Sequence, residues 1–172
     1  MDEADQTSAV RLPGHFDAFY RSEYKAVVAL MYGLSGSTWV AEDLAQEAFL
    51  RAHRDWERVG PLDSPGAWVR RVGINLARSR WRRIRTEAAV RLRIQGRETA
   101  IEALTTHDGT FWDEVRKLPS RQAQAIALRY VDDLPVGEIA QIMETAEGTV
   151  RALLHQGRGR LERQLVARGW VE

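Results

Sequence analysis

The chain has 172 residues, of which 44% are hydrophobic, and its 25 basic and 24 acidic residues give a net charge of +1. This composition is sufficient for one or two packed domains and excludes a disordered tail. The absence of cysteine excludes disulfides and thiolate metal sites, and the four histidines are too scattered to predict a ligand cluster. No apolar run approaches the roughly 20 residues that span a bilayer, and residues 1–5 are acidic, unlike a secretory signal, so we expect a cytoplasmic protein.

Charge is unevenly distributed along the chain. Residues 64–97 carry ten arginines and one acid, whereas residues 1–63 and 98–119 are net acidic and residues 120–172 are neutral. Arginines clustered in one segment, with tryptophan and asparagine among them, indicate a surface that faces a polyanion. The alternative is an exposed helix face that the arginines merely solvate.

The first two predicted helices lie in the acidic part. Apolar side chains recur at three- and four-residue spacing from Phe16 to Leu34, which places them on one helix face, and glycines then interrupt the pattern. A second helical pattern starts after Ser37 or Thr38, either of which can cap it, and acids follow where the helix dipole favours them. Its buried stripe is predicted to contain Leu44, Ala48 and Ala52, with Ala45 and Phe49 alongside.

A loop and an arginine-rich helix follow. Residues 58–63 contain glycine and proline and are predicted to form the loop. Ser64 and Pro65 mark a helix start, because serine caps free N–H groups and proline at the first position has no N–H to lose. Helical spacing predicts an inward face of Trp68, Val72, Leu76 and Ala77. The arginines must then project elsewhere, and since no period-two alternation occurs, we predict no strand.

The second half of the chain predicts a linker and a second helical unit. Residues 105–110 are typical of a linker, and apolar positions resume at Phe111. Ser120 is expected to cap the next helix. That helix is expected to be buried through Ala123, Ile126, Ala127 and Tyr130.

Two short helices are predicted between Pro135 and Leu154. The inner face of the first is expected to contain Ile139, Ala140 and Met143, and that of the second to contain Val150 with Leu153 or Leu154. This packing is typical of a helix-turn-helix, whose second helix enters the major groove of DNA. An ordinary helical hairpin is the alternative.

Three motifs occur in a fixed order: the run from Ala41 to Ala52, the segment from Pro65 to Arg83, and the terminal helix-turn-helix. Together they resemble a bacterial sigma factor of the extracytoplasmic-function group. The resemblance implies an all-α fold of two small helical domains joined by a flexible linker. The implied divisions are an N-terminal tail at 1–13, region 2 at 14–87, a linker at 88–109, region 4 at 110–166 and a C-terminal tail at 167–172.

The resemblance also implies where region 2 binds its partners. Its second helix would dock on the clamp coiled coil of the large RNA polymerase subunit, through an acidic, amide-bearing face beside an exposed aromatic. The residues expected there are Asp43, Leu44, Gln46, Glu47, Phe49 and Leu50. The arginine-rich helix would hold the separated strands of the −10 promoter element. The residues expected there are Arg70, Arg71, Asn75, Arg78, Arg82 and Arg83.

Two residues of this helix have alternative roles. In relatives, an asparagine placed like Asn75 and the loop before the helix help to hold a flipped base, and an amide that both donates and accepts suits that task. The alternative for Asn75 is a structural hydrogen bond within the helix. Trp68 can stack on a base, but its spacing with Val72 and Leu76 favours a core anchor.

Region 4 would contact the −35 element and the polymerase flap. The residues expected on the −35 element are Thr149, Arg151, Ala152, His155, Gln156 and Arg158. The chain departs from the family at several positions, which include Ser79 in region 2 and Pro135, Glu144, Ala152, Leu153 and Gln156 in region 4. Two glycines inside the predicted recognition helix each cost about 1 kcal/mol relative to alanine. We therefore expect a weaker or differently specified −35 contact.

The implied function is that of a sigma factor, a dissociable subunit that binds core polymerase, directs it to specific promoters and helps to melt the −10 element. It needs no metal or nucleotide cofactor, and an anti-sigma factor is a possible further partner. Two other classes remain: a helix-turn-helix regulator that binds duplex operators without polymerase, and a nuclease. The nuclease lacks support because the sequence has no paired carboxylates at metal-binding spacing, no catalytic cysteine and no glycine-rich phosphate loop.

Overall fold

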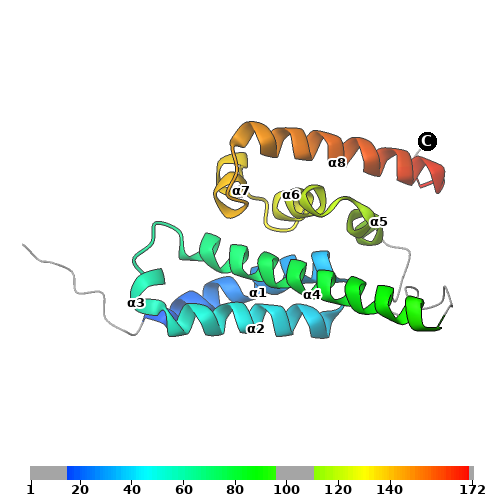
Figure 1. The fold of residues 1–172 in the computed structure, drawn as a ribbon. Coiled ribbons are helices and arrows are strands. Elements are labelled where there is room, and N and C mark those ends of the chain that lie inside the picture. The colour runs from blue at the N-terminus through cyan, green and yellow to red at the C-terminus, as the bar shows by residue number, and fades with distance from the viewer. Residues whose placement is uncertain (1–14, 96–110, 171–172) are drawn as a thin grey trace, which may run out of the picture.

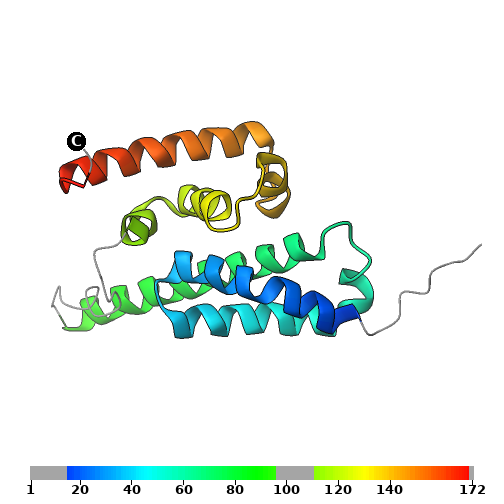
Figure 2. The same ribbon diagram turned by 180° about the vertical axis from the view of Figure 1, so that it is seen from behind.

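The computed structural model describes residues 15–95 and 111–170, and within these ranges all regular structure is helical, as predicted. The helices form two layers (Figures 1 and 2). The first layer contains α1 (His15–Ser35), α2 (Thr38–Arg54), α3 (Trp56–Val59) and α4 (Pro65–Gln95). The second contains α5 (Phe111–Lys117), α6 (Ser120–Tyr130), α7 (Val136–Ile142) and α8 (Glu147–Ala167). Among the described helices, none is both long and apolar enough to cross a membrane.

The helix starts of the first layer follow from local sequence. The Ser37 hydroxyl accepts a hydrogen bond from the backbone N–H of Val40 at 3.4 Å, and the Ser64 hydroxyl accepts one from Ala67 at 3.2 Å. Both predicted helix starts are therefore confirmed. Gly36, with a φ of 72°, turns the chain between α1 and α2 in a conformation that glycine adopts without strain.

The predicted loop at 58–63 is partly wrong. The turn of helix α3 ends at Val59, so the loop starts only after it. Val59 is completely buried, and Trp56 packs its ring 5.1 Å from that of Phe19. Burial of these two apolar side chains stabilises a helical turn that the nearby glycine and proline obscured in the sequence.

An aromatic cluster fills one end of the first layer. Phe49 from α2 lies 5.0 Å, centroid to centroid, from the ring of Tyr20 on α1, and 5.8 Å from that of Phe19. The larger buried aliphatic side chains of this layer include Leu30 and Met31. These contacts hold α1 and α2 as a pair on which α4 packs, so the arginines of α4 have a fixed support.

The second layer is built around α6, which lies between the long helix α8 and the first layer (Figure 1). Gly157 lets α8 approach closely, because a Cβ there would lie only 3.1 Å from the Cγ1 of the buried Ile126.

Two predictions for α6 are wrong. The N-cap is Pro119, and the Ser120 hydroxyl instead accepts a hydrogen bond from the Gln124 side chain at 3.1 Å. Tyr130 is exposed, because it lies at the last position of the helix, beyond the crossing with α8.

The two layers contact each other directly. Helix α1 lies against α5 and α6, and α4 lies against α7. The Arg116 guanidinium donates a hydrogen bond to the carbonyl oxygen of Gly33 at 3.3 Å, and the ring of Trp112 lies over the same glycine. The second layer therefore covers part of α1 and part of α4.

Candidate partner and nucleic-acid interfaces

The outer face of α2 lies on the side of the first layer remote from the second (Figure 1). Trp39, Asp43, Gln46 and Leu50 follow at spacings of four, three and four residues, so they share this face, and all four are exposed. Glu47 lies beside them, half-buried, and its carboxylate accepts a hydrogen bond from Arg51 at 2.8 Å. The face therefore combines two apolar side chains with acidic and amide groups.

Two of the predicted docking residues are not on this face. Leu44 and Phe49 lie in the core, and Phe49 is only 2% exposed, so the prediction of an exposed aromatic at that position is wrong. The exposed aromatic is Trp39, with 69% of its surface accessible. The sequence carried the signal, because Trp39 shares helical spacing with Asp43 and Gln46, whereas Phe49 belongs to the buried stripe.

Arg80 connects this face to α4. Its guanidinium lies 5.9 Å from the ring centroid of Trp39 and 3.6 Å from the carboxylate of Asp43. Contacts of this kind restrict the tryptophan and the carboxylate without burying them. The face is thus partly ordered before any partner binds.

Arginines of α4 form a stripe with Asn75. Arg71, Asn75, Arg78 and Arg82 are spaced by four, three and four residues and lie along one face of the helix, on which Arg71 is half-buried and the other three are exposed. The side chains of Asn75, Arg78 and Arg82 make no hydrogen bond or ion pair with any other described residue. Arg83, on a neighbouring face, is exposed and pairs weakly with Glu87 at 3.5 Å. Among the residues that the structure describes, the Asn75 amide therefore has no hydrogen-bond partner.

Arg70 does not join this stripe, contrary to the prediction. Its guanidinium is buried between the layers and donates to the Glu23 carboxylate at 2.6 Å, to the Asp132 carboxylate at 2.9 Å and to the Gly66 carbonyl at 3.2 Å. Burial alone lowers the pKa of Arg70, but the hydrogen bonds and charges of Asp132 and Glu23 raise it by more, so it lies above its ordinary value. Local sequence gave no sign of this pairing, because Asp132 is 62 residues away.

Arg71 is also engaged between the layers. It is half-buried, and its guanidinium donates to the carboxylate of Glu144 at 2.5 Å.

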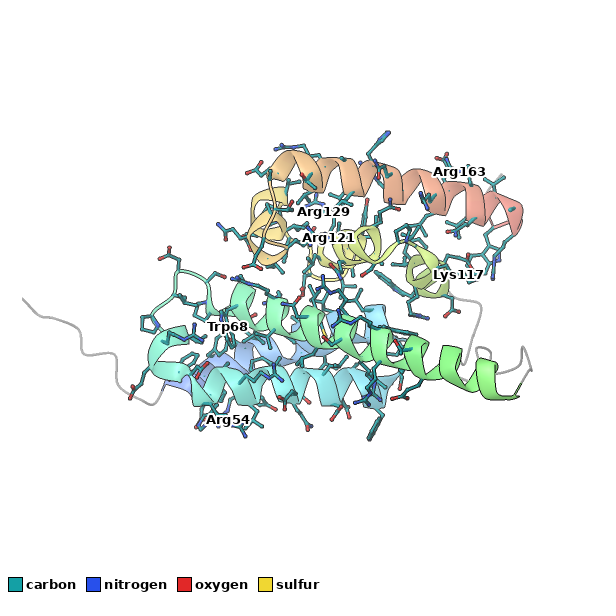
Figure 3. All side chains as sticks on the ribbon, in the orientation of Figure 1. Arg54, Trp68, Lys117, Arg121, Arg129 and Arg163 are labelled. Carbon is teal, nitrogen blue, oxygen red and sulfur yellow. The ribbon has the colours of Figure 1, made fainter. Side chains whose placement is uncertain are left out.

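Trp68, near the start of the same helix (Figure 3), packs against the core, and the Arg58 guanidinium lies 5.9 Å from its ring centroid. These contacts favour a core anchor over base stacking for Trp68.

The helix-turn-helix of α7 and α8 forms as predicted. Its inner face contains Ile139, Ala140, Met143, Val150 and Leu154, all of which are buried. Two arginines of α6 hold α7 at both ends (Figure 3): Arg129 donates to the Leu134 carbonyl at 2.9 Å, and Arg121 donates to the Met143 carbonyl at 3.1 Å. These hydrogen bonds fix α7 against α6.

All of the residues predicted on the −35 element are exposed on α8: Thr149, Arg151, Ala152, His155, Gln156 and Arg158. Two of them have partners, since Arg151 pairs with Glu147 at 2.6 Å and the Gln156 side-chain oxygen accepts from Gln122 at 3.1 Å. A hollow of about 550 Å³ beside them is lined by Arg129, Pro135, Val136, Arg151, Leu154 and Arg158. Arg129 was not predicted, because only the fold brings α6 next to α8.

Two protein families match the chain. The family described as Sigma-70 region 2 matches residues 19–87, and the one described as Sigma-70, region 4 matches residues 109–161, together more than two thirds of the chain. The ECF RNA polymerase sigma factor SigW of Bacillus subtilis is 29% identical over 154 residues, which cover 81% of this chain and 82% of SigW. The chain belongs to the extracytoplasmic-function group of sigma factors.

Further comparisons agree with this assignment. The RNA polymerase sigma-E factor of Streptomyces coelicolor is 28% identical over 155 residues, which cover 89% of this chain and 87% of that factor. The sigma factor RpoE from Bartonella quintana, solved in complex with the anti-sigma factor NepR, has a TM-score of 0.68 over 88% of this chain and 96% of RpoE. Since their identity is 21%, this likeness shows a shared fold.

The activity of the chain follows from its family membership. As a sigma factor it is a transcription initiation factor that binds core RNA polymerase, directs it to specific promoters and helps to melt the −10 element. The first layer contains region 2 and the second contains region 4. Helix α4 continues to Gln95, eight residues beyond the end of the region 2 match.

Proposed function

We propose that the outer face of α2 docks this sigma factor on core polymerase. Trp39 and Leu50 supply apolar groups at its two ends, and Asp43 and Gln46 supply a charge and an amide between them. Exposed tryptophans are frequent hot spots of protein interfaces, and carboxylates form charge-assisted hydrogen bonds with basic side chains of a partner. The clamp coiled coil of the large polymerase subunit is the surface that the family resemblance implies.

The observation that carries this proposal is the presence of apolar and acidic side chains on one exposed face, away from region 4. The double variant Asp43→Ala with Glu47→Ala removes both carboxylates and should weaken binding of the full chain to core polymerase in a mobility-shift assay. The matched control, Asp17→Ala with Glu57→Ala, removes two exposed acids of α1 and α3 and should bind like the parent. Equal affinity for both double variants would remove the α2 face from the interface.

Helix α4 is proposed to supply the −10 surface. Asn75 would hold a base of the separated non-template strand, since its amide can both donate and accept and has no hydrogen-bond partner among the described residues. Arg78 and Arg82 on the same face, and Arg83 on the neighbouring face, would hold backbone phosphates. Such a stripe can contact both the bases and the phosphates of a single strand, whereas the bases of a duplex are paired and stacked. The stripe would therefore bind separated strands in preference to duplex.

Helix α8 is proposed to contact the −35 element. Its six exposed residues named above supply hydrogen-bonding and basic groups for base edges and phosphates. Three arginines around the hollow, namely Arg129, Arg151 and Arg158, would add a site for a backbone phosphate. Because Arg151 is already paired with Glu147, this contact is expected to be weaker than that of the α4 stripe.

The remaining parts of the proposal concern the cell. The protein is proposed to catalyse no reaction of its own, to use no cofactor and to act in the cytoplasm, where core polymerase works. An anti-sigma factor is proposed as a further partner, because RpoE of Bartonella quintana forms a complex with one. Affinity purification of the tagged protein from its native cell tests both partners. Core polymerase and an anti-sigma factor should each copurify with it.

A further inference from the structure

A buried glutamine of α6 holds the side chain of Gln156 on α8. Gln122 is 5% exposed, and its Nε2 donates a hydrogen bond to the Oε1 of Gln156 at 3.1 Å. Gly157 lets the two helices come this close, because a Cβ there would lie only 3.1 Å from Ile126. The crossing of α6 and α8 therefore places a buried amide against an exposed residue of the predicted recognition helix.

This hydrogen bond determines which end of the Gln156 amide is available to a ligand. Its Oε1 is held by Gln122, whereas none of the described residues accepts a hydrogen bond from its Nε2. Gln156 shares a face of α8 with Thr149 and Ala152, at spacings of three and four residues, and all three are exposed. The group that Gln156 has left for a ligand on this face is therefore its NH₂, with two hydrogens to donate.

Stability alone does not account for a glutamine at position 122. Its Oε1 is buried and has no hydrogen-bond partner among the described residues, so the side chain leaves one polar group unsatisfied. Methionine has nearly the same size and shape and would fill the same space with no amide to desolvate. The stability gained from one hydrogen bond to an exposed side chain is no larger than the cost of the unsatisfied oxygen. A role in holding Gln156 gives the amide a purpose.

The chemistry of the NH₂ group predicts which base it would recognise. A glutamine with both ends of its amide free pairs with adenine, because Oε1 accepts from N6 and Nε2 donates to N7. When Oε1 is held by another donor, donation from Nε2 is the main interaction left. Guanine offers two adjacent acceptors in the major groove, N7 and O6, whereas adenine offers N7 alone beside an amino group. Gln156 held in this way should therefore favour guanine over adenine.

We propose that Gln122 is a positioning residue for promoter recognition: it holds the Oε1 of Gln156 and so directs the NH₂ of Gln156 to a guanine of the −35 element. The inference rests on the proposed contact of α8 with that element. It goes further, because it assigns a base preference to one residue and makes that preference depend on a buried side chain. Different variants test the two ideas, so they fail separately.

Base selection by the full chain bound to core polymerase tests the inference. A promoter that this complex transcribes is made with a fully randomised −35 element, the bound duplexes are recovered, and the bases at each position are counted by sequencing. Gln156→Ala removes the side chain that would contact the base. Gln122→Met and Gln122→Leu remove only the buried donor and keep an apolar side chain of similar volume, so region 4 is expected to fold in at least one of them.

Gln124 provides a matched control for Gln122. Both are glutamines of α6, with exposures of 6% and 5%, and each donates a hydrogen bond from Nε2 at 3.1 Å. The acceptor of Gln124 is the hydroxyl of Ser120 on the same helix. Gln124→Met thus removes an equivalent buried donor without removing a contact to Gln156.

In the parent, one position of the −35 element should favour guanine over adenine by about tenfold, which lies within the discrimination of a good base contact. Gln156→Ala and both Gln122 variants should lose this preference at that position and keep the parent preferences elsewhere. Gln124→Met should select the same bases as the parent.

Two results separate this inference from the proposed −35 contact. Loss of the preference in Gln156→Ala but not in the Gln122 variants would overturn the inference and leave the contact of α8 with DNA standing. No change at any position in Gln156→Ala would overturn both. A parent that prefers adenine or cytosine at the position read by Gln156, or Gln122 variants that change all positions equally, would also overturn the inference, since Gln122 would then not direct the NH₂ of Gln156.

Discussion

Trp39→Ala separates a docking role from a structural one. The side chain is 69% exposed, and the contact that the structure gives its ring is the Arg80 guanidinium at 5.9 Å. Loss of one exposed cation–π contact should lower the free energy of unfolding by at most about 1 kcal/mol. A tryptophan anchor in an interface contributes about 2 kcal/mol or more, so truncation should weaken the complex with core polymerase about 30-fold.

The assay is competition between the unlabelled variant and a fluorescently labelled parent for core polymerase, with a thermal melt of the free protein alongside. Trp170→Ala is the matched control, because Trp170 is 47% exposed and carries an arginine, Arg168, 5.8 Å from its ring centroid. It should compete like the parent. The reasoning is refuted if Trp39→Ala also competes like the parent, or if both variants lose affinity equally.

Two further predictions concern base recognition and helix packing. Asn75→Ala should reduce open-complex formation mainly at promoters with the preferred −10 base, whereas Ser79→Ala, one turn further along the exposed face, should not; equal loss by Asn75→Ala at every promoter sequence would count against base recognition. Gly159→Ala should raise the free energy of unfolding by about 1 kcal/mol, since its Cβ meets only the end of a flexible arginine. Gly157→Ala should lower it by about 1 kcal/mol, because its Cβ would overpack against Ile126, and a calorimetric melt in which both variants gain stability would contradict the close crossing.

Local features of the fold could be predicted from the sequence because their causes are local. Ser37 and Ser64 cap helices with hydroxyls that reach N–H groups three residues ahead, and the inner faces of the helix-turn-helix follow from spacing alone. Local spacing was not sufficient to identify the exposed aromatic of α2, which is Trp39 and not the predicted Phe49. The buried stripe of this helix is wide enough to include Phe49.

The environment of Arg70 could not be predicted in this way. Whether an arginine of α4 meets DNA or a carboxylate depends on how region 4 packs, and no local pattern connects it to Asp132. The same holds for Glu144, whose left-handed turn and partner Arg71 emerge only from the packed domains. Long-range ion pairs of this kind have no periodic signature, because they depend on relative domain position.

The central claim is that this chain selects the promoters at which core polymerase starts. The most direct test is transcription of a fragmented genomic template by purified core polymerase, with and without the protein, followed by mapping of the 5′ ends of the transcripts. The account predicts a small set of new start sites that share sequence at −10 and appear only when the protein is present. An identical set of 5′ ends in both reactions would contradict it.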